Sequence, residues 1–156
     1  MPTLRPDKGG RWLARVVLDG RQIACKMFPP GKKFGPQWRA AKKWEEEQLA
    51  KAIQEQEIRT DLERLMVWGS DYLSHAQRTM SHKTYVEKQL VMRDFFDFCG
   101  KAGITALEDI SLSRAYRFLT RIYVARGGNV ANKYRKNLLA AWTWGLDFVE
   151  DFPQIT

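Results

Sequence analysis

The sequence predicts an α+β fold, in which a small three-stranded antiparallel sheet with one helix precedes an all-α domain of four helices. The first sixty residues hold two β-rich runs around an Asp-Gly pair, and the rest of the chain has helical apolar spacing. The 156 residues, 44% of them hydrophobic, suffice for one ordinary core or two small ones. We therefore expect two domains, residues 1–60 and 61–156.

The predicted sheet comes first. Trp12–Leu18 and Gln22–Phe28 are rich in β-formers and flank Asp19-Gly20, a strong hairpin signal because glycine tolerates the positive φ of a tight turn. A short strand near Thr3–Arg5 precedes them, with Asp7–Gly10 as the turn. Since side chains alternate along a strand, one face of the second strand is expected to form the core and the other to point outward. The expected core face holds Trp12, Ala14, Val16 and Leu18, which leaves Arg15 outward.

Helical patterns follow a Pro- and Gly-rich loop. Ser81 and Ser111 are expected to cap two of the helices and Asn129 a third, and Gly127-Gly128 to end the helix before it. The predicted helices span about residues 37–59, 61–77, 82–101, 112–125 and 130–148. Their expected core residues include Tyr85, Leu90, Met92, Phe95, Phe96, Cys99, Leu112, Ala115, Phe118, Leu119 and Ile122.

The last predicted helix carries all its cations at its front end. At about 100° per residue it has an apolar stripe and an opposite polar face. The stripe holds Val130, Tyr134, Leu138, Ala141, Gly145 and Phe148, and the polar face holds Asn132, Lys133, Lys136 and Thr143. The helix N-terminus already has partial positive charge, which disfavours lysine there by about 0.3–1 kcal/mol. Either these lysines are only solvated, or an anion such as phosphate meets this end.

The charge is unevenly distributed. The chain has a net charge of +8, but residues 1–44 contain eleven Lys/Arg and two acids, and residues 111–146 contain seven Lys/Arg and no acid. Residues 45–110 between them are net negative. Because a soluble surface usually mixes both signs, this pattern indicates two anion-binding surfaces.

Composition also excludes several classes of protein. There is no apolar run of about 18 residues for a membrane span and no secretory signal, so a cytoplasmic protein is expected. Cys25 and Cys99 are isolated and expected to be buried thiols, and neither His75 nor His82 pairs with them at a zinc spacing. We expect no metal, no cofactor and no catalytic residue in this chain.

The helical segments resemble the core-binding (SAM-like) domain of tyrosine-type site-specific recombinases, the phage integrase family. The resemblance rests on the order of "SHKTYVEKQLVMRDFFDFC", "GITALEDIS" and "NVANKYRKNLLAAWTWGLDF". The front segment "GRWLARVVLDGRQIACKMFP" followed by "AAKKWEEEQ" is similar to the family's arm-binding domain. The catalytic domain would follow the matched part and is absent from this chain. His75-Ala-Gln-Arg78 matches the family's H-x-x-R spacing, but it precedes the core-binding match and we interpret it as coincidence.

The resemblance implies that double-stranded attachment-site DNA is the partner, with other integrase protomers and accessory DNA-bending proteins on the same DNA, in the nucleoid. The starts of two helices would contact DNA through His82, Lys83, Thr84, Lys88, Asn132, Lys133 and Lys136. The sheet face away from the helix would read a groove through Arg11, Arg15, Arg21 and Lys26. Trp142 and Trp144 are expected in the core, and Arg114, Arg117 and Arg121 share a helix face that would meet DNA, a protomer or water.

Two other functions fit the same sequence. A stand-alone DNA-binding or regulatory protein would use the same modules without a catalytic domain. A helical protein–protein adaptor with a basic surface would bind no DNA once mild salt is present. An enzyme complete within these residues is the least favoured, because no paired carboxylates, metal cluster or glycine-rich phosphate loop stands out.

Overall fold

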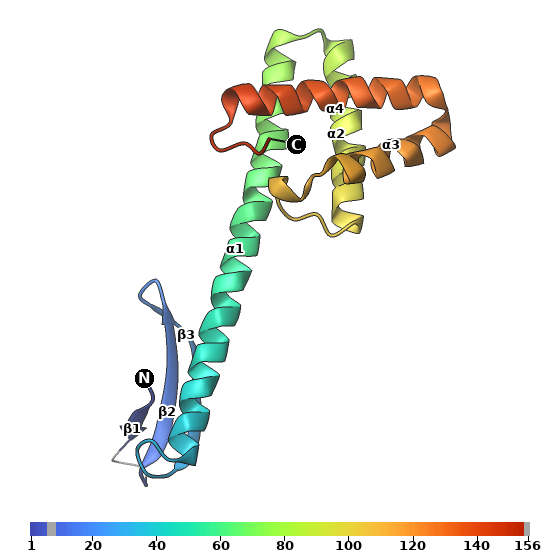
Figure 1. Cartoon of the computed structure of the whole chain (residues 1–156). Helices are drawn as coiled ribbons and strands as arrows, with labels where there is room; N and C mark the ends of the chain where they lie inside the picture. Colours follow the sequence, from blue (N-terminus) through green and yellow to red (C-terminus); the bar gives the residue numbers. More distant parts are fainter. Residues whose placement is uncertain (6–8, 155–156) are drawn as a thin grey trace. The chain divides into compact units, whose positions relative to one another are not determined.

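The computed structural model in Figure 1 describes residues 1–5 and 9–154 of the chain. It consists of two compact units, Met1–Glu57 and Ile58–Thr156. The division falls three residues before the end of the predicted first domain, at residue 60, and each unit is described by itself below.

The first unit begins with a three-stranded antiparallel sheet in the order β1-β2-β3, which confirms the predicted architecture. The strands are β1 (Thr3–Arg5), β2 (Arg11–Leu18) and β3 (Arg21–Pro30). Asp19 and Gly20 join β2 to β3 with positive φ values of 49° and 75°, the conformation that the Asp-Gly pair predicts. Asp7 and Lys8 of the predicted first turn lie outside the described residues.

The core of the first unit lies between the sheet and the first part of helix α1 (Figure 1). Trp12 and Ala14 of β2 pack there against Trp38 and Ala41 of α1, as the strand alternation predicts. Val16 is also buried, whereas Leu18 is only half-buried. The Trp12 indole donates a hydrogen bond to the Gly31 carbonyl over 3.1 Å, so its one polar atom is satisfied.

Helix α1 runs without a break over Pro36–Thr79. The prediction of two helices, 37–59 and 61–77, is therefore wrong. Proline does not occur between residues 37 and 79, and a ladder of ion pairs between residues four apart continues along the helix, including Lys51–Glu55 and Arg59–Glu63. Each such pair favours helix by a few tenths of a kcal/mol, about 0.2–0.5, so the polar middle stays helical although little packs on it.

Three further helices follow in the second unit: α2 (His82–Lys101), α3 (Leu112–Arg126) and α4 (Gly128–Phe148), with a short 3-10 turn, η2 (Leu107–Asp109), before α3. The side chains of Ser81 and Ser111 cap α2 and α3 as predicted, accepting from backbone N–H groups three residues on.

Gly127, and not Asn129, is the N-cap of α4. Its φ of +87° suits glycine, and the residue serves both helices. Its N–H donates to the Tyr123 carbonyl and its carbonyl accepts from Ala131, so one residue ends α3 and starts α4. Asn129 is already inside the first turn, where its side chain cannot serve as the cap.

Trp68 of α1 lies at the centre of the second unit's core. It is 1% exposed, its indole donates to the Ala141 carbonyl of α4, and its ring lies near those of Trp142 and Phe152. Accordingly, α4 crosses both α2 and the last part of α1 in Figure 1. The core also holds Leu65, Tyr72, Val91, Met92, Phe95, Phe98, Cys99, Phe118 and Tyr134.

Three residues predicted to lie in the core are exposed: Leu90, Leu112 and Phe148. Leu112 is 62% exposed because it lies on the side of α3 that carries Tyr116 and Tyr123, whereas the buried stripe is centred on Phe118. Leu90 is at the margin of the α2 stripe. Phe148 ends α4, where its ring lies near those of His75 and Trp144 but stays 69% exposed.

Candidate nucleic-acid interface

The start of α2 presents three of the predicted contact residues to solvent. His82, Lys83 and Thr84 form its first turn and all three are exposed. The Thr84 hydroxyl lies 2.9 Å from the Ser81 hydroxyl, so it is shared with the cap. Lys83 is the one lysine of the three, and its ammonium has no hydrogen-bond or ion-pair partner among the described residues.

The start of α4 presents the second predicted group. Asn132, Lys133 and Lys136 are exposed on the side opposite the buried Tyr134 and Ala141, as the helical spacing predicts. Asn132 accepts a 3.4 Å hydrogen bond from Arg135. Neither Lys133 nor Lys136 pairs with a carboxylate in the part of the chain that the structure describes. Both ammonium groups are thus available to an anion.

Lys88 does not belong to this surface. It is 7% exposed, its Nζ donates to Asn137 Oδ1 over 3.1 Å, and the ammonium lies 5.6 Å from the centre of the Tyr72 ring. The prediction that Lys88 contacts DNA is therefore wrong. The physical reason is its helix position, because Lys88 lies one turn before the buried Val91 and Met92 and faces α4.

Asn137 fastens α2 to α4 beside the exposed lysines. Its amide nitrogen donates to Glu87 over 3.0 Å and to the Lys133 carbonyl, and its oxygen accepts from Lys88. Lys83 stands one turn before Glu87, and Lys133 one turn before Asn137. The contact thus joins α2 to α4 through residues 50 positions apart in sequence, one turn away from Lys83 on α2 and from Lys133 on α4.

A second network fixes the start of α4. The Tyr134 hydroxyl donates to Asp94 of α2 over 2.6 Å and accepts from Arg126 at the end of α3 over 3.0 Å. Burial raises the pKa of the Tyr134 phenol, and the hydrogen bond to Asp94 raises it further. The phenol therefore stays protonated and acts as a packing and hydrogen-bonding residue between three helices.

In the first unit, Arg15 lies on the sheet face away from α1, as predicted. It is exposed and pairs with Cys25 across the strands. The Arg15 backbone N–H donates to the Glu45 carboxylate of α1 over 2.8 Å. This hydrogen bond satisfies the N–H beyond Leu13, where the pairing of β1 with β2 ends. Arg11 and Arg21 are exposed at opposite ends of β2 and β3.

Lys26 lies on the other face of the sheet, so its assignment to the outward face is wrong. The register pairs it with Ala14, which is fully buried against α1, and its Nζ lies 5.3 Å from the Phe28 ring. Alternation along one strand cannot reveal this, because the face depends on the pairing between strands. An irregularity between Val16 and Val17 also shifts the register near the turn.

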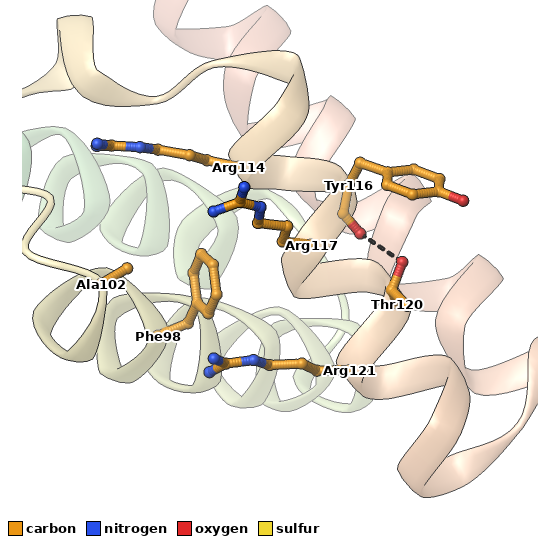
Figure 2. A pocket seen from close by; sticks show the side chains of 7 residues that line it. All are labelled: Phe98, Ala102, Arg114, Tyr116, Arg117, Thr120 and Arg121. Carbon is orange, nitrogen blue, oxygen red and sulfur yellow. Dashed lines mark hydrogen bonds between the residues drawn. The ribbon is translucent and has the colours of Figure 1, made fainter.

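The sequence alone did not reveal a basic groove of about 480 Å³ between the end of α2 and α3 (Figure 2). Arg114, Arg117 and Arg121 line it from α3, as their spacing on one helix face suggested. The other lining residues are Phe98, Ala102, Tyr116 and Thr120. Only the packing of α2 on α3 places Phe98 beneath the arginines, so no local pattern could have located the groove.

Other predicted features are placed as follows. Trp142 and Trp144 are partly buried and pack against the core, as predicted. Cys99 is buried, but Cys25 is exposed, so the expectation of two buried thiols is wrong for Cys25. His75 of the H-x-x-R match lies against the rings of Trp144 and Phe148.

Two kinds of feature are absent from the described residues. No three His, Cys, Asp or Glu side chains there are grouped to hold a metal ion. None of the helices in that part of the chain combines the length and the apolar character that crossing a membrane requires. In comparisons with known proteins, the chain matches no family model, no curated protein and no solved structure.

Proposed function

We propose that this chain binds the phosphate backbone of double-stranded DNA, and that it is the DNA-binding part of a tyrosine-type site-specific recombinase. The observation that carries the proposal is the joint between α2 and α4. Asn137 holds these helices together where Lys83, Lys133 and Lys136 are exposed. Lys133 and Lys136 belong to residues 111–146, a stretch of sequence without an acid. A contact with backbone phosphate requires only a positive charge that can reach it, and exposed lysines meet this requirement.

The recombinase part of the proposal rests on the order of the sequence segments that resemble the family. The same order accounts for both basic regions, one on a sheet and one on helix starts. In this proposal the chain supplies binding and no chemistry. We expect that incubation with duplex DNA yields no covalent protein–DNA adduct, and an adduct would contradict this part of the proposal.

Replacement of Lys133 and Lys136 together by Gln tests the DNA contact. Each phosphate contact adds about 0.9 to the slope of log K against log salt, so the double variant should lose roughly two units of slope. Affinity should fall by a similar factor on duplexes of unrelated sequence, because backbone contacts carry no sequence information. Fluorescence anisotropy with labelled duplexes at several salt concentrations measures both quantities.

The matched control is Lys43→Gln with Lys51→Gln. These two exposed lysines of α1 are already paired with Glu47 and Glu55, and their loss changes the net charge equally. The control should keep the salt slope. An unchanged slope in the test variant would mean that Lys133 and Lys136 are only solvated. Failure of the unaltered chain to bind any duplex at low salt would remove the DNA proposal as a whole.

A further inference from the structure

The exposed side of α3 has the composition of a protein-binding surface. It presents Leu112, Tyr116, Tyr123 and Val124, each more than half exposed, together with arginines. The helix contains neither lysine nor any acid. Protein interfaces are enriched in Tyr and Arg and depleted of Lys, Glu and Asp. A DNA backbone contact would not require the exposed apolar side chains, so this face favours a protein partner.

The groove beside this face is built to receive carboxylates. Figure 2 shows Arg114, Arg117 and Arg121 extending from α3 over the end of α2, with Phe98 standing between Arg117 and Arg121. The Arg121 guanidinium lies 5.1 Å from the Phe98 ring centre. Arg114 donates to the Asp109 carbonyl. Among the described residues, no carboxylate lines the groove.

Arg117 is the most available of these arginines. It is exposed, and none of its donors is used by a residue that the structure describes. A guanidinium presents a planar fork of donors that matches a carboxylate in a bidentate geometry. The ligand expected in the groove is therefore an acidic side chain flanked by apolar ones, which would cover the exposed Tyr116.

The same unit carries a surface with this composition. The end of α4 and the turn after it expose three acids, Asp147, Glu150 and Asp151, with two large apolar side chains, Leu146 and Phe148. We call these five residues the acidic corner. No lysine or arginine occurs in residues 137–154. Arg64 of α1 reaches the corner, but it donates to the Asp151 carbonyl and pairs with Glu108, so the three carboxylates of the corner have no cationic partner among the described residues.

We propose that the arginine groove of one copy of this chain binds the acidic corner of a second copy. The contact joins two different surfaces, so it is heterologous, and each dimer retains one free groove and one free corner. Association should therefore continue beyond the dimer or close into a ring as concentration rises. It should weaken with salt, because exposed charge pairs are screened beyond about 10 Å at 0.1 M. This inference requires no DNA and is independent of the proposed function.

Sedimentation velocity of the full chain without DNA tests the proposal. Unaltered protein should show a weight-average sedimentation coefficient that rises with concentration at low salt and less so at high salt. Arg117→Glu replaces the unpaired guanidinium of the groove with a carboxylate. Asp147→Arg combined with Glu150→Arg reverses the sign of the charge at two of the three acids of the acidic corner. Each variant alone should associate at least about tenfold more weakly, the loss expected when a close charge pair becomes repulsive.

Mixing the two variants gives the decisive measurement. The Arg117→Glu protein keeps an intact corner and the corner variant keeps an intact groove, so an equimolar mixture should regain a dimer that neither forms alone. Arg78→Glu, an exposed cation at the end of α1, is the matched control and should associate like the unaltered chain. Circular dichroism checks that all variants are folded.

Three outcomes would overturn the proposal. The first is unaltered protein that stays monomeric at low salt up to millimolar concentration. The second is a mixture of folded variants that remains monomeric. The third is Arg117→Glu protein that associates normally but loses duplex affinity, which would assign the groove to nucleic acid.

Discussion

Two neighbouring residues of α4, Lys136 and Asn137, have opposite roles. Lys136 is exposed, whereas Asn137 is the acceptor for the buried Lys88 ammonium and the donor to Glu87. Asn137 is therefore expected to contribute to the stability of the fold, and Lys136 to the binding of DNA.

Asn137→Ala should lower the free energy of unfolding by about 1–3 kcal/mol, because it leaves a buried ammonium and a carboxylate without their partner. Lys136→Gln should change stability by less than about 0.5 kcal/mol and reduce the salt slope of DNA binding by about one unit. Urea denaturation and anisotropy titrations measure the two effects. Equal stability of both variants would show that Lys88 does not depend on Asn137.

The two cysteines should differ strongly in reactivity. Burial raises the pKa of the Cys99 thiol to about 12, whereas Cys25 is exposed on β3. At pH 8 a disulfide reagent should modify one thiol rapidly and the second only after denaturation, since the thiolate is the nucleophile. Cys25→Ser should abolish the rapid phase. A rapid phase that persists in this variant would contradict the burial of Cys99.

The raised pKa of the Cys99 thiol also predicts how the stability of the fold depends on pH. A raised folded-state pKa means that the fold favours the neutral thiol over the thiolate. This contribution is complete below the ordinary thiol pKa and is lost as pH rises from there toward about 12. Cys99→Ala should remove this part of the alkaline destabilisation, measured as urea midpoints at pH 8 and pH 11 relative to the unaltered chain.

At the scale of elements, close packing depends on a glycine of α4. A Cβ built on Gly145 would lie 2.5 Å from the Phe152 ring, and that ring is held between Trp142 and Trp68 at centroid distances of 4.6 and 5.7 Å. The segment after α4 can therefore fold back on the helix only if residue 145 has no side chain.

Gly145→Ala should destabilise the second unit by about 1–3 kcal/mol through overpacking. Gly100 provides the matched comparison, because it is also helical but, apart from the adjacent backbone of its own helix, no atom of the described residues lies within 4 Å of the position its Cβ would take. Gly100→Ala should stabilise by about 0.4–1 kcal/mol, since alanine restricts the unfolded chain. Urea unfolding monitored by tryptophan fluorescence compares them, and a stabilising Gly145→Ala would contradict the packing.

At the scale of the whole molecule, α1 contributes to both compact units, yet residues 53–60 of this helix are all exposed. Core residues lie on either side of this stretch, Trp38 and Ala41 before it and Leu65 and Trp68 after it. The middle of the helix is therefore held by its own hydrogen bonds and ion pairs more than by packing.

Glu57→Pro should break α1 locally and leave both cores folded. Proline in a helix interior costs about 3 kcal/mol. The disrupted turn lies within residues 53–60, which are all exposed and outside both cores. Hydrogen exchange should show reduced protection around residues 53–61 and unchanged protection in β2 and α4. Glu57→Ala should leave the whole pattern unchanged. Loss of protection in either core would show that the units depend on a continuous helix.

Much of the fold could be predicted because its signals are local. Asp19-Gly20 marked the hairpin through its tolerance of positive φ, and Ser81 and Ser111 marked helix starts through their capping hydroxyls. The predicted break between two helices at residues 60 and 61 was wrong, because an acid such as Asp61 is as compatible with a helix interior as with a helix start. Leu112 was misplaced because an apolar residue at the edge of a stripe fits either side.

By itself, the sequence determined the α+β class, the order of elements, the uneven charge and the exposure of Lys133 and Lys136, because each depends on spacing within a single element. Only the tertiary structure decided that Lys88 is buried, that Lys26 faces the helix side of the sheet and that Phe98 lies beneath the arginines of α3. These outcomes depend on strand register and on helix contacts between residues as many as 50 positions apart. The charge or polarity of a side chain gives no information about which distant partner will cover it.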